Sequence, residues 1–325
     1  MSGARVLHVV QAPPFLTVQD LGRPGLRHLG VPAGGAMDPW ALRTANALVG
    51  NAEGAAGLEW AVGGGMVRFE CAATVALVGT DAEVWIGDRP APTCATLAVA
   101  AGETLTVGRL GAGRFLYLAV GGGIDVPAVL GGRGTYLPAG FGGWAGRRLA
   151  AGDALPLGAP PAAAPRPGFT CPADLAPPAP AGDDAPIRVT EGPQAARLTT
   201  DGWAALLGQR FVVTAASDRT GYRLEGEPLA LTSDVVAPSE PGCAGALQLP
   251  PGGQPIVLMA DAPTVGGYPK PAVVCAADLG RLAQRPPGAE VRFARVTVAE
   301  AQRLYRRARI RVDTVVRREA QGARS

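Results

Sequence analysis

The chain has 325 residues, of which 46 are glycine and 31 are proline, whereas only 18% are charged. Its net charge of +3 at pH 7 is too small, and too concentrated near the C-terminal end, to indicate nucleic-acid binding. Two histidines exclude a histidine-rich metal site, and five widely spaced cysteines without a C-x-x-C pair argue against structural zinc and a disulfide framework. The length favours two domains. Frequent turns between short apolar runs favour a mainly β protein.

The N-terminal region lacks the basic and then apolar pattern of a secretion signal, and no apolar run is long enough to span a membrane. The cysteine pattern fits a reducing compartment. From these features we expect a soluble cytoplasmic protein.

Short apolar runs predict the strands of the first half of the chain. They cover residues 5–10, 66–69, 75–78, 83–86, 96–100 and 114–120. One helix is well marked among them, because Asp38 is a natural N-cap, Pro39 suits the first helical position and Gly50 follows as a C-terminal stop.

An Ala/Pro/Gly-rich stretch, residues 159–186, has almost no apolar periodicity and is typical of a semi-rigid linker. It separates a first expected β domain, residues 1–158, from a second, residues 187–311. Three segments each place a glycine turn before an alternating strand, and they begin at Ala101, Ala151 and Pro287. The later two fall near the ends of the two halves, which is compatible with two related domains.

The second half has the same character. Strands are predicted at residues 187–190, 211–215, 256–259 and 272–275. A second helix is expected to begin at Thr297, whose spacing to Glu300 makes a capping box, and to run toward Arg309. Its arginines form a basic face that is either solvated or meets an acidic partner. From Val312 to the end of the chain we expect a disordered tail.

Lys270 is the only lysine of the chain, beside 29 arginines. An ammonium is a compact point charge whose pKa shifts readily on burial, whereas a guanidinium is a planar group that stays charged. One interpretation is an arginine-rich composition with a lysine left by chance on the surface. The other is a functional lysine, which its neighbours favour: Gly266, Gly267 and Tyr268 make backbone suited to close approach.

Residues 17–38 form the stretch densest in polar side chains among glycines and prolines, a composition typical of binding loops. With residues 48–51 and 58–59 it resembles the opening of the allophanate hydrolase subunit 2 family, also described as the biotin-dependent carboxyltransferase (KipA) family. The resemblance continues in order along nearly the whole chain. It includes residues 121–127, 130–137, 140–143, 191–194, 217–226, 247–261 and 266–270.

The resemblance implies two cyclophilin-like β-barrel domains with a few short helices. It also implies three possible activities. The first is that of the C subunit of an ATP-dependent 5-oxoprolinase, which opens 5-oxoproline to glutamate together with an A subunit and a KipI-like B subunit. The second is transfer of a carboxyl group from carboxybiotin to urea or a related amide. The third is a regulatory role, in which the chain antagonises a KipI-like kinase inhibitor.

Two sequence features bear on the cofactors. The chain lacks a biotin-attachment Met-Lys pair and has no second lysine to carry biotin, and it also lacks the G-x-x-x-x-G-K-[ST] phosphate loop. Biotin, under the carboxyltransferase alternative, therefore belongs to another chain. ATP is used by the complex, at a site that this sequence does not identify.

Work on a small amide or lactam requires donors to an oxygen that gains charge and a group that moves a proton. Within the segments that carry the resemblance, Lys270, Asp261 and Tyr268 are the catalytic candidates. The substrate-binding candidates are Asp38, Arg219, Tyr222, Arg223, Gln248, Gln254, Thr264, Gly266 and Gly267. Each also has a structural interpretation, as an ion pair, a packed ring or a turn.

Three positions depart from the family pattern. Gly34 stands where the family usually has serine, and Ala262 and Pro263 stand where it usually has arginine and glutamine. The losses affect the expected substrate more than the expected fold.

Overall fold

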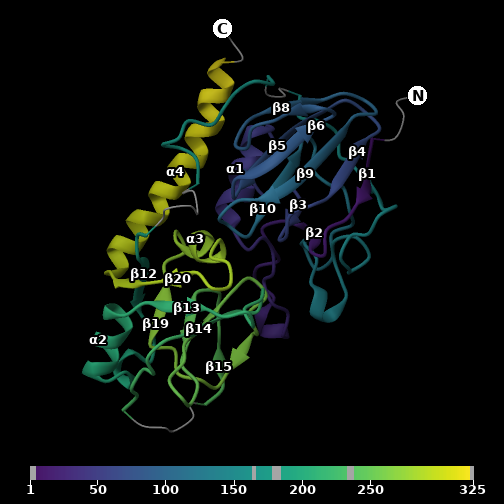
Figure 1. The fold of residues 1–325 in the computed structure, drawn as a ribbon. Helices are drawn as coiled ribbons and strands as arrows, with labels where there is room; N and C mark the ends of the chain where they lie inside the picture. The colour runs from purple at the N-terminus through teal and green to yellow at the C-terminus, as the bar shows by residue number, and fades with distance from the viewer. Residues whose placement is uncertain (1–4, 163–165, 178–183, 233–237, 323–325) are drawn as a thin grey trace. The chain divides into compact units, whose positions relative to one another are not determined.

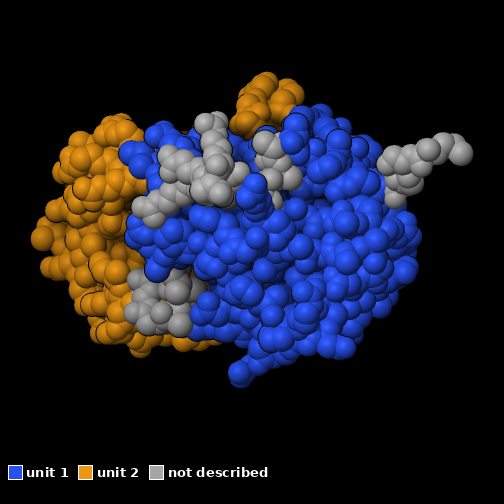
Figure 2. All heavy atoms as spheres, turned by 90° about the horizontal axis from the view of Figure 1, so that it is seen from above, with its two compact units in different colours: residues 1–22, 38–181, 309–325 blue, residues 23–37, 182–308 orange. Residues whose placement is uncertain are grey.

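The computed structural model describes residues 5–162, 166–177, 184–232 and 238–322. In this part of the chain the structure is mostly β with four α-helices, so the mainly β prediction is confirmed. Figure 1 shows the arrangement of strands and helices as a ribbon. The chain forms two compact units, coloured blue and orange in Figure 2. Unit 1 comprises residues 1–22, 38–181 and 309–325, and unit 2 comprises residues 23–37 and 182–308.

Unit 1 contains two antiparallel sheets. The first has the order β11 (Ala154–Pro156), β1 (Val6–Gln11), β4 (Met66–Phe69), β9 (Thr104–Leu110), β6 (Ala82–Ile86) and β7 (Arg89–Pro90). The second has the order β2 (Leu16–Gln19), β3 (Gly57–Trp60), β10 (Leu116–Val120), β5 (Ala73–Gly79) and β8 (Leu97–Val99). Inward-facing residues of both sheets form one apolar core that includes the fully buried Trp60. Each large side chain buried there contributes roughly 1.5–3 kcal/mol.

Helix α1 (Pro39–Leu48) begins and ends as the sequence predicts. The Asp38 side chain accepts hydrogen bonds from the backbone amides of Trp40 and Ala41, and Gly50 follows the helix in the left-handed conformation with φ of 72°. The Asp38 amide donates a 2.7 Å hydrogen bond to the Tyr117 hydroxyl, which donates at 2.7 Å to Glu59. These buried polar groups therefore satisfy one another, and Asp38 is held at the helix end.

Unit 2 is built on an eight-stranded, nearly closed barrel sheet. Its order is β20 (Glu290–Val291), β13 (Phe211–Val213), β14 (Gly221–Glu225), β17 (Ile256–Leu258), β16 (Ala246–Gln248), β19 (Ala272–Val274), β12 (Ile187–Glu191) and β21 (Phe293–Arg295). All described pairings in this sheet are antiparallel except that of β12 with β21. A separate ribbon joins β15 (Glu240–Pro241) to β18 (Val265–Gly266).

Short helices complete unit 2. They are α2 (Thr200–Gly208), α3 (Leu279–Ala283), and the 3₁₀ turns at Arg27–Leu29 and Ala195–Arg197, and a third 3₁₀ turn at Leu137–Ala139 lies in unit 1. Asp278, at the start of α3, is fully buried. Its Oδ2 accepts 2.8 Å hydrogen bonds from both the backbone amide and the side-chain Nε of Arg188. This contact fixes α3 to β12.

Helix α4 (Val298–Gly322) is longer than the sequence indicated. The expectation of a disordered tail from Val312 was wrong over the described residues, because the helix continues to Gly322. Ala308, Val312 and Val315 recur at helical spacing and are buried, and this apolar stripe stabilises the added turns. The end of the expected tail, residues 323–325, lies outside the described residues.

The two units do not follow the expected boundaries at residues 158 and 187. Residues 23–37 belong to unit 2 although they precede α1, and residues 166–177 of the expected linker belong to unit 1. Cys171 and Leu175 in that segment are buried, which explains why it packs as part of a unit. Residues 163–165 and 178–183 of the linker lie outside the described residues.

Within the described ranges, every helix is too short or too polar to cross a bilayer.

Candidate functional site

The candidate site lies in unit 2, where the β15–β18 ribbon meets the segment that ends at Lys270. Glu240 on β15 pairs with Gly266 on β18, and the chain then runs through Gly267 and Tyr268 to Lys270. Gly192 allows another segment to approach the lysine backbone, since a Cβ at that position would lie 2.1 Å from the Lys270 carbonyl oxygen. Two stretches far apart in the sequence are thereby brought together.

Lys270 is buried, with only 4% of its side chain exposed. Its Nζ lies 3.4 Å from Glu240 Oε2, which makes an ion pair. Among the described residues Nζ has no hydrogen-bond partner, so the contact with Glu240 lacks hydrogen-bond geometry. The Glu240 side chain is 40% exposed, so one member of the ion pair is buried and the other is accessible to solvent. A buried ammonium with unused donors is expensive unless another group completes its contacts.

Gln194 links the two members of this pair. Its Nε2 donates a 2.6 Å hydrogen bond to Glu240 Oε2, and its Oε1 accepts a 3.0 Å hydrogen bond from the Lys270 backbone amide. Neither Gln194 nor Glu240 was among the site residues predicted from the sequence. Gln194 lay in a segment of the family resemblance, whereas Glu240 had no local signal, because the β15–β18 pairing alone places it here.

Gln248 lies beside the ribbon. It is 6% exposed, at the end of β16, and a Cβ added at Gly266 would lie 2.5 Å from its Nε2. Glycine at 266 therefore leaves room for this amide. We call Gln194, Glu240, Gln248, Gly266 and Lys270 the Lys270 cluster.

Arg219 and Asp261 form a second feature of unit 2. Arg219 Nε donates to Asp261 Oδ2 at 2.8 Å and its Nη2 donates to Oδ1 at 2.9 Å, in a two-pronged ion pair. The same Nη2 donates at 2.7 Å to the Gly35 carbonyl oxygen. The Gly34 amide donates at 3.1 Å to the Ala260 carbonyl oxygen. Asp261 and Arg219 therefore hold residues 23–37 in place.

The departures from the family pattern lie around this ion pair. A Cβ at Gly34 would lie 3.1 Å from Arg23 Nη1, and the residue has φ of 65°. Ala262 is buried in a small apolar cluster with Ala246 and Leu258. The Pro263 carbonyl oxygen accepts a 2.7 Å hydrogen bond from Arg27.

Other candidates from the sequence lie elsewhere or differ in exposure. Tyr222 is fully buried and its hydroxyl donates at 2.6 Å to the Ala283 carbonyl oxygen. Gln254 exchanges hydrogen bonds with the backbone of Gly226 through both ends of its amide. Asp38 caps α1 in unit 1. Tyr222 and Gln254 therefore have structural contacts of their own within unit 2.

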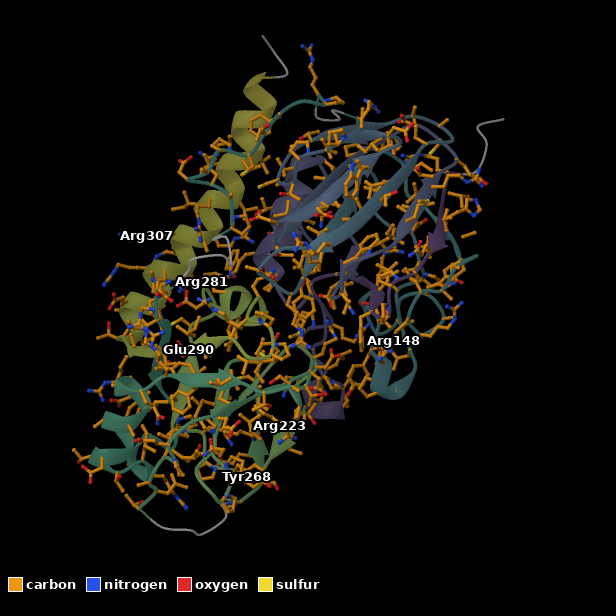
Figure 3. The ribbon with its side chains drawn as sticks, in the orientation of Figure 1. Arg148, Arg223, Tyr268, Arg281, Glu290 and Arg307 are labelled. Atoms are coloured by element: carbon orange, nitrogen blue, oxygen red, sulfur yellow. The ribbon has the colours of Figure 1, made fainter. Side chains whose placement is uncertain are left out.

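The remaining candidates are Tyr268, Thr264 and Arg223. Tyr268 is 39% exposed, two residues before Lys270, and Arg223 is exposed on β14; Figure 3 labels both side chains. The Thr264 carbonyl oxygen accepts a 3.0 Å hydrogen bond from the Gly242 amide and extends the β15–β18 ribbon.

The described residues contain no group of three or more His, Cys, Asp or Glu side chains that could hold a metal ion.

Comparison with known proteins identifies the relatives of the chain. It is 38% identical to the C subunit of 5-oxoprolinase from Escherichia coli (strain K12) over 296 residues, which cover 91% of this chain and 93% of that protein. It is 36% identical to the C subunit of 5-oxoprolinase from Haemophilus influenzae over 312 residues, covering 96% and 98%. The crystal structure of the K. lactis urea amidolyase matches 97% of this chain with a TM-score of 0.88 and 28% identity. This chain spans 20% of that larger protein.

A family model described as the carboxyltransferase domain, subdomain A and B, matches residues 29–295. The match covers most of the chain, and the family resemblance read from the sequence is thereby confirmed. The chain belongs to the carboxyltransferase domain family, subdomain A and B.

Proposed function

We propose that the chain is the C subunit of a multi-subunit, ATP-dependent 5-oxoprolinase, which converts 5-oxoproline, ATP and water to glutamate, ADP and phosphate. Two bacterial relatives carry that name and match over more than nine-tenths of both chains. The required partners are then an A subunit and a KipI-like B subunit. A cytoplasmic location is part of the same proposal, because the substrate and ATP are intracellular metabolites.

The observation that carries the proposed chemistry is the buried ammonium of Lys270. It faces Glu240 at 3.4 Å and keeps donors that no described residue uses. 5-Oxoproline is a small anion with a carboxylate and a ring amide, so it offers acceptors for that ammonium. A bound anionic oxygen would complete the contacts of Nζ and offset the cost of burying the charge.

We assign roles to the neighbours on the same basis. Lys270 stabilises negative charge on an oxygen of the substrate or of the transition state. Glu240 accepts a proton or an N–H hydrogen bond from the ring amide. Gln248 orients the amide, since its side chain can both donate and accept. Tyr268, which is partly exposed, donates a hydrogen bond to the substrate, and the Gly267 backbone amide is a second candidate donor.

Asp261 takes a positioning role in this proposal, not a catalytic one. Both of its carboxylate oxygens accept hydrogen bonds from Arg219, which also donates to Gly35. The pair orders residues 23–37 and the segment that leads into β18. ATP is assigned to the complex, and no residue of this chain is assigned to it.

Carboxyl transfer is the second candidate function, favoured by the structural match to urea amidolyase. Biotin would then be attached to another chain, because Lys270 is the only lysine here and is buried. The Lys270 cluster would in that case bind urea or a related amide together with the carboxyl group. A purely regulatory role, in which the chain antagonises a KipI-like kinase inhibitor, is the third candidate.

Reconstitution separates the three candidates. The chain is combined with purified A and B subunits, and ATP hydrolysis that depends on 5-oxoproline is measured with and without it. The proposal predicts turnover only when all three are present. Carboxybiotin-dependent urea carboxylation without 5-oxoproline-dependent hydrolysis would replace it with the second candidate. Partner binding that relieves a kinase inhibitor, and that survives replacement of Lys270 and Glu240, would support the third.

A further inference from the structure

Cys94 and Cys171 face each other in unit 1, although they are distant in the sequence. Ala95 pairs with Thr170 in an antiparallel bridge. The Cys171 amide donates a 2.8 Å hydrogen bond to the Cys94 carbonyl oxygen, and on the other side of the bridge the Thr96 amide donates at 2.8 Å to Phe169. The two cysteines are therefore directly opposite each other across a short ladder.

Their geometry suits a disulfide. In a regular ladder, opposite residues joined by a hydrogen bond have Cα atoms about 5.5 Å apart, inside the range of about 4.4–6.8 Å that a disulfide requires. Cys94 itself departs from regular strand geometry, with φ of 54°. The side chains also meet, since a hydrogen bond between the thiols is the main cause that raises the pKa of Cys94 above its ordinary value. Both cysteines are reduced thiols in this structure.

Exposure differs between the two thiols. Cys94 is half-buried, whereas Cys171 is 6% exposed. A small reagent from solvent therefore reaches Cys94 first, and Cys171 is positioned to react with the product. Because the pKa of Cys94 is raised, its thiolate fraction is small at neutral pH, and the exchange should become faster as the pH rises. The cysteines outside the pair provide comparisons, since Cys243 is exposed and Cys275 is buried.

We propose that Cys94 and Cys171 form a reversible disulfide by exchange with a low-molecular-weight disulfide. The Cys94 thiol loses its proton and attacks one sulfur of the reagent, which breaks the reagent S–S bond and releases one thiolate. Cys171 then loses its proton and attacks the Cys94 sulfur of the mixed disulfide, which releases the second thiolate. Two protein thiols are oxidised and one small disulfide is reduced to two thiols.

The disulfide would link residues 166–177 of the expected linker covalently to the rest of unit 1. Residues 166–177 contact this unit through the short ladder and through the buried side chains of Cys171 and Leu175. A covalent tie between Cys94 and Cys171 limits how far this segment can detach in partly unfolded states, and stabilises the folded chain for that reason. The attachment of the segment then depends on the thiol–disulfide state of its surroundings.

The test uses the full chain and oxidised glutathione. Reduced protein is incubated with the reagent, the remaining thiols are blocked, and the digest is mapped by mass spectrometry without reduction. We expect a peptide pair linked through Cys94 and Cys171, the loss of these two thiols from the five reduced ones in addition to any glutathionylation of the exposed Cys243, and a rise in Tm of roughly 2–4 °C. Dithiothreitol should reverse all three changes.

Serine variants of the cysteines test whether the disulfide joins Cys94 to Cys171. Cys94→Ser and Cys171→Ser should each abolish the linked peptide and the rise in Tm, whereas the control Cys243→Ser should retain both. The mapping of the unaltered chain stands by itself if a variant fails to fold. Absence of the linked peptide under conditions that glutathionylate Cys243, or an identical Tm for oxidised and reduced protein, would overturn the proposal.

Discussion

The backbone amide of Lys270 donates a 3.0 Å hydrogen bond to the side chain of Gln194, a residue from a distant part of the chain. The other end of the same amide side chain donates to Glu240, the acidic partner of Lys270. One neutral side chain therefore sets the position of both charged residues.

Gln194→Ala should lower turnover while preserving the fold. Removing the amide releases Glu240 and the Lys270 backbone, and small displacements of catalytic groups cost roughly 10- to 100-fold in rate. The measurement is 5-oxoproline-dependent ATP hydrolysis in the reconstituted complex, with kcat and KM determined separately. Gln254→Ala is the control, because that amide bonds to Gly226 away from the cluster. Equal losses in both variants would point to a stability effect.

Lys270→Met and Lys270→Arg should both lose activity. Methionine removes the charge that stabilises an anionic oxygen, an effect of about 10²- to 10³-fold. Arginine keeps the charge, but its planar group does not reproduce the compact ammonium in a space that leaves 4% of the side chain exposed. Circular dichroism and partner binding monitor folding, and Arg303→Lys on the exposed face of α4 is the control. Full turnover in Lys270→Arg would place the lysine outside the chemistry.

Gly266→Ala is expected to impair turnover with little change in Tm. The new Cβ would lie 2.5 Å from Gln248 Nε2, the flexible end of a side chain, so Gln248 moves and the backbone does not. Gly208→Ala introduces a methyl group with no atom within 4 Å and should leave both quantities unchanged. Thermal melting and steady-state kinetics of the two variants give the comparison. A turnover in Gly266→Ala equal to that of Gly208→Ala would exclude Gln248 from the site.

Asp261→Asn should destabilise unit 2 by about 3 kcal/mol, because it leaves the guanidinium of Arg219 largely buried without its counter-charge. Glu290→Gln breaks an ion pair whose two side chains are half-exposed, and should cost about 0–1 kcal/mol. Urea unfolding of both variants measures the difference. If Asp261→Asn proved as stable as Glu290→Gln, the proposed role of Asp261 in holding residues 23–37 would be rejected.

Cys275 should react slowly with iodoacetamide at neutral pH. Burial, with a smaller contribution from the charge of Asp278, raises the pKa of its thiol to about 11. Because only the thiolate reacts, its alkylation rate should increase about tenfold per pH unit up to that value. The raised pKa also makes the free energy of unfolding depend on pH. Its stabilising contribution is fully present below about pH 8.5 and is lost as the pH rises toward 11. Site-resolved mass spectrometry gives the rate, and a plateau below pH 9 would contradict the shifted pKa.

Local sequence patterns determined the mainly β class, about half of the strands and helix α1. Helix α1 was predictable because its signals are local. Asp38 and Pro39 meet the hydrogen-bonding needs of the first turn, and Gly50 ends the helix. The ordered family segments also determined membership. The sequence did not indicate several short strands, because most of them pair with segments that are distant in the chain. They are β2, β3, β7, β14, β15, β16 and β18.

Only the tertiary structure decided which polar residues meet. Glu240 faces Lys270 because β15 pairs with β18, and a sheet register between distant segments has no local signal. The same holds for residues 23–37, which join unit 2 through hydrogen bonds to Arg219 and Ala260. Sequence spacing sets helix caps and apolar faces, since those depend on neighbours in the chain. Long-range packing determined the cluster around Lys270, because its contacts form between residues that the chain itself keeps apart.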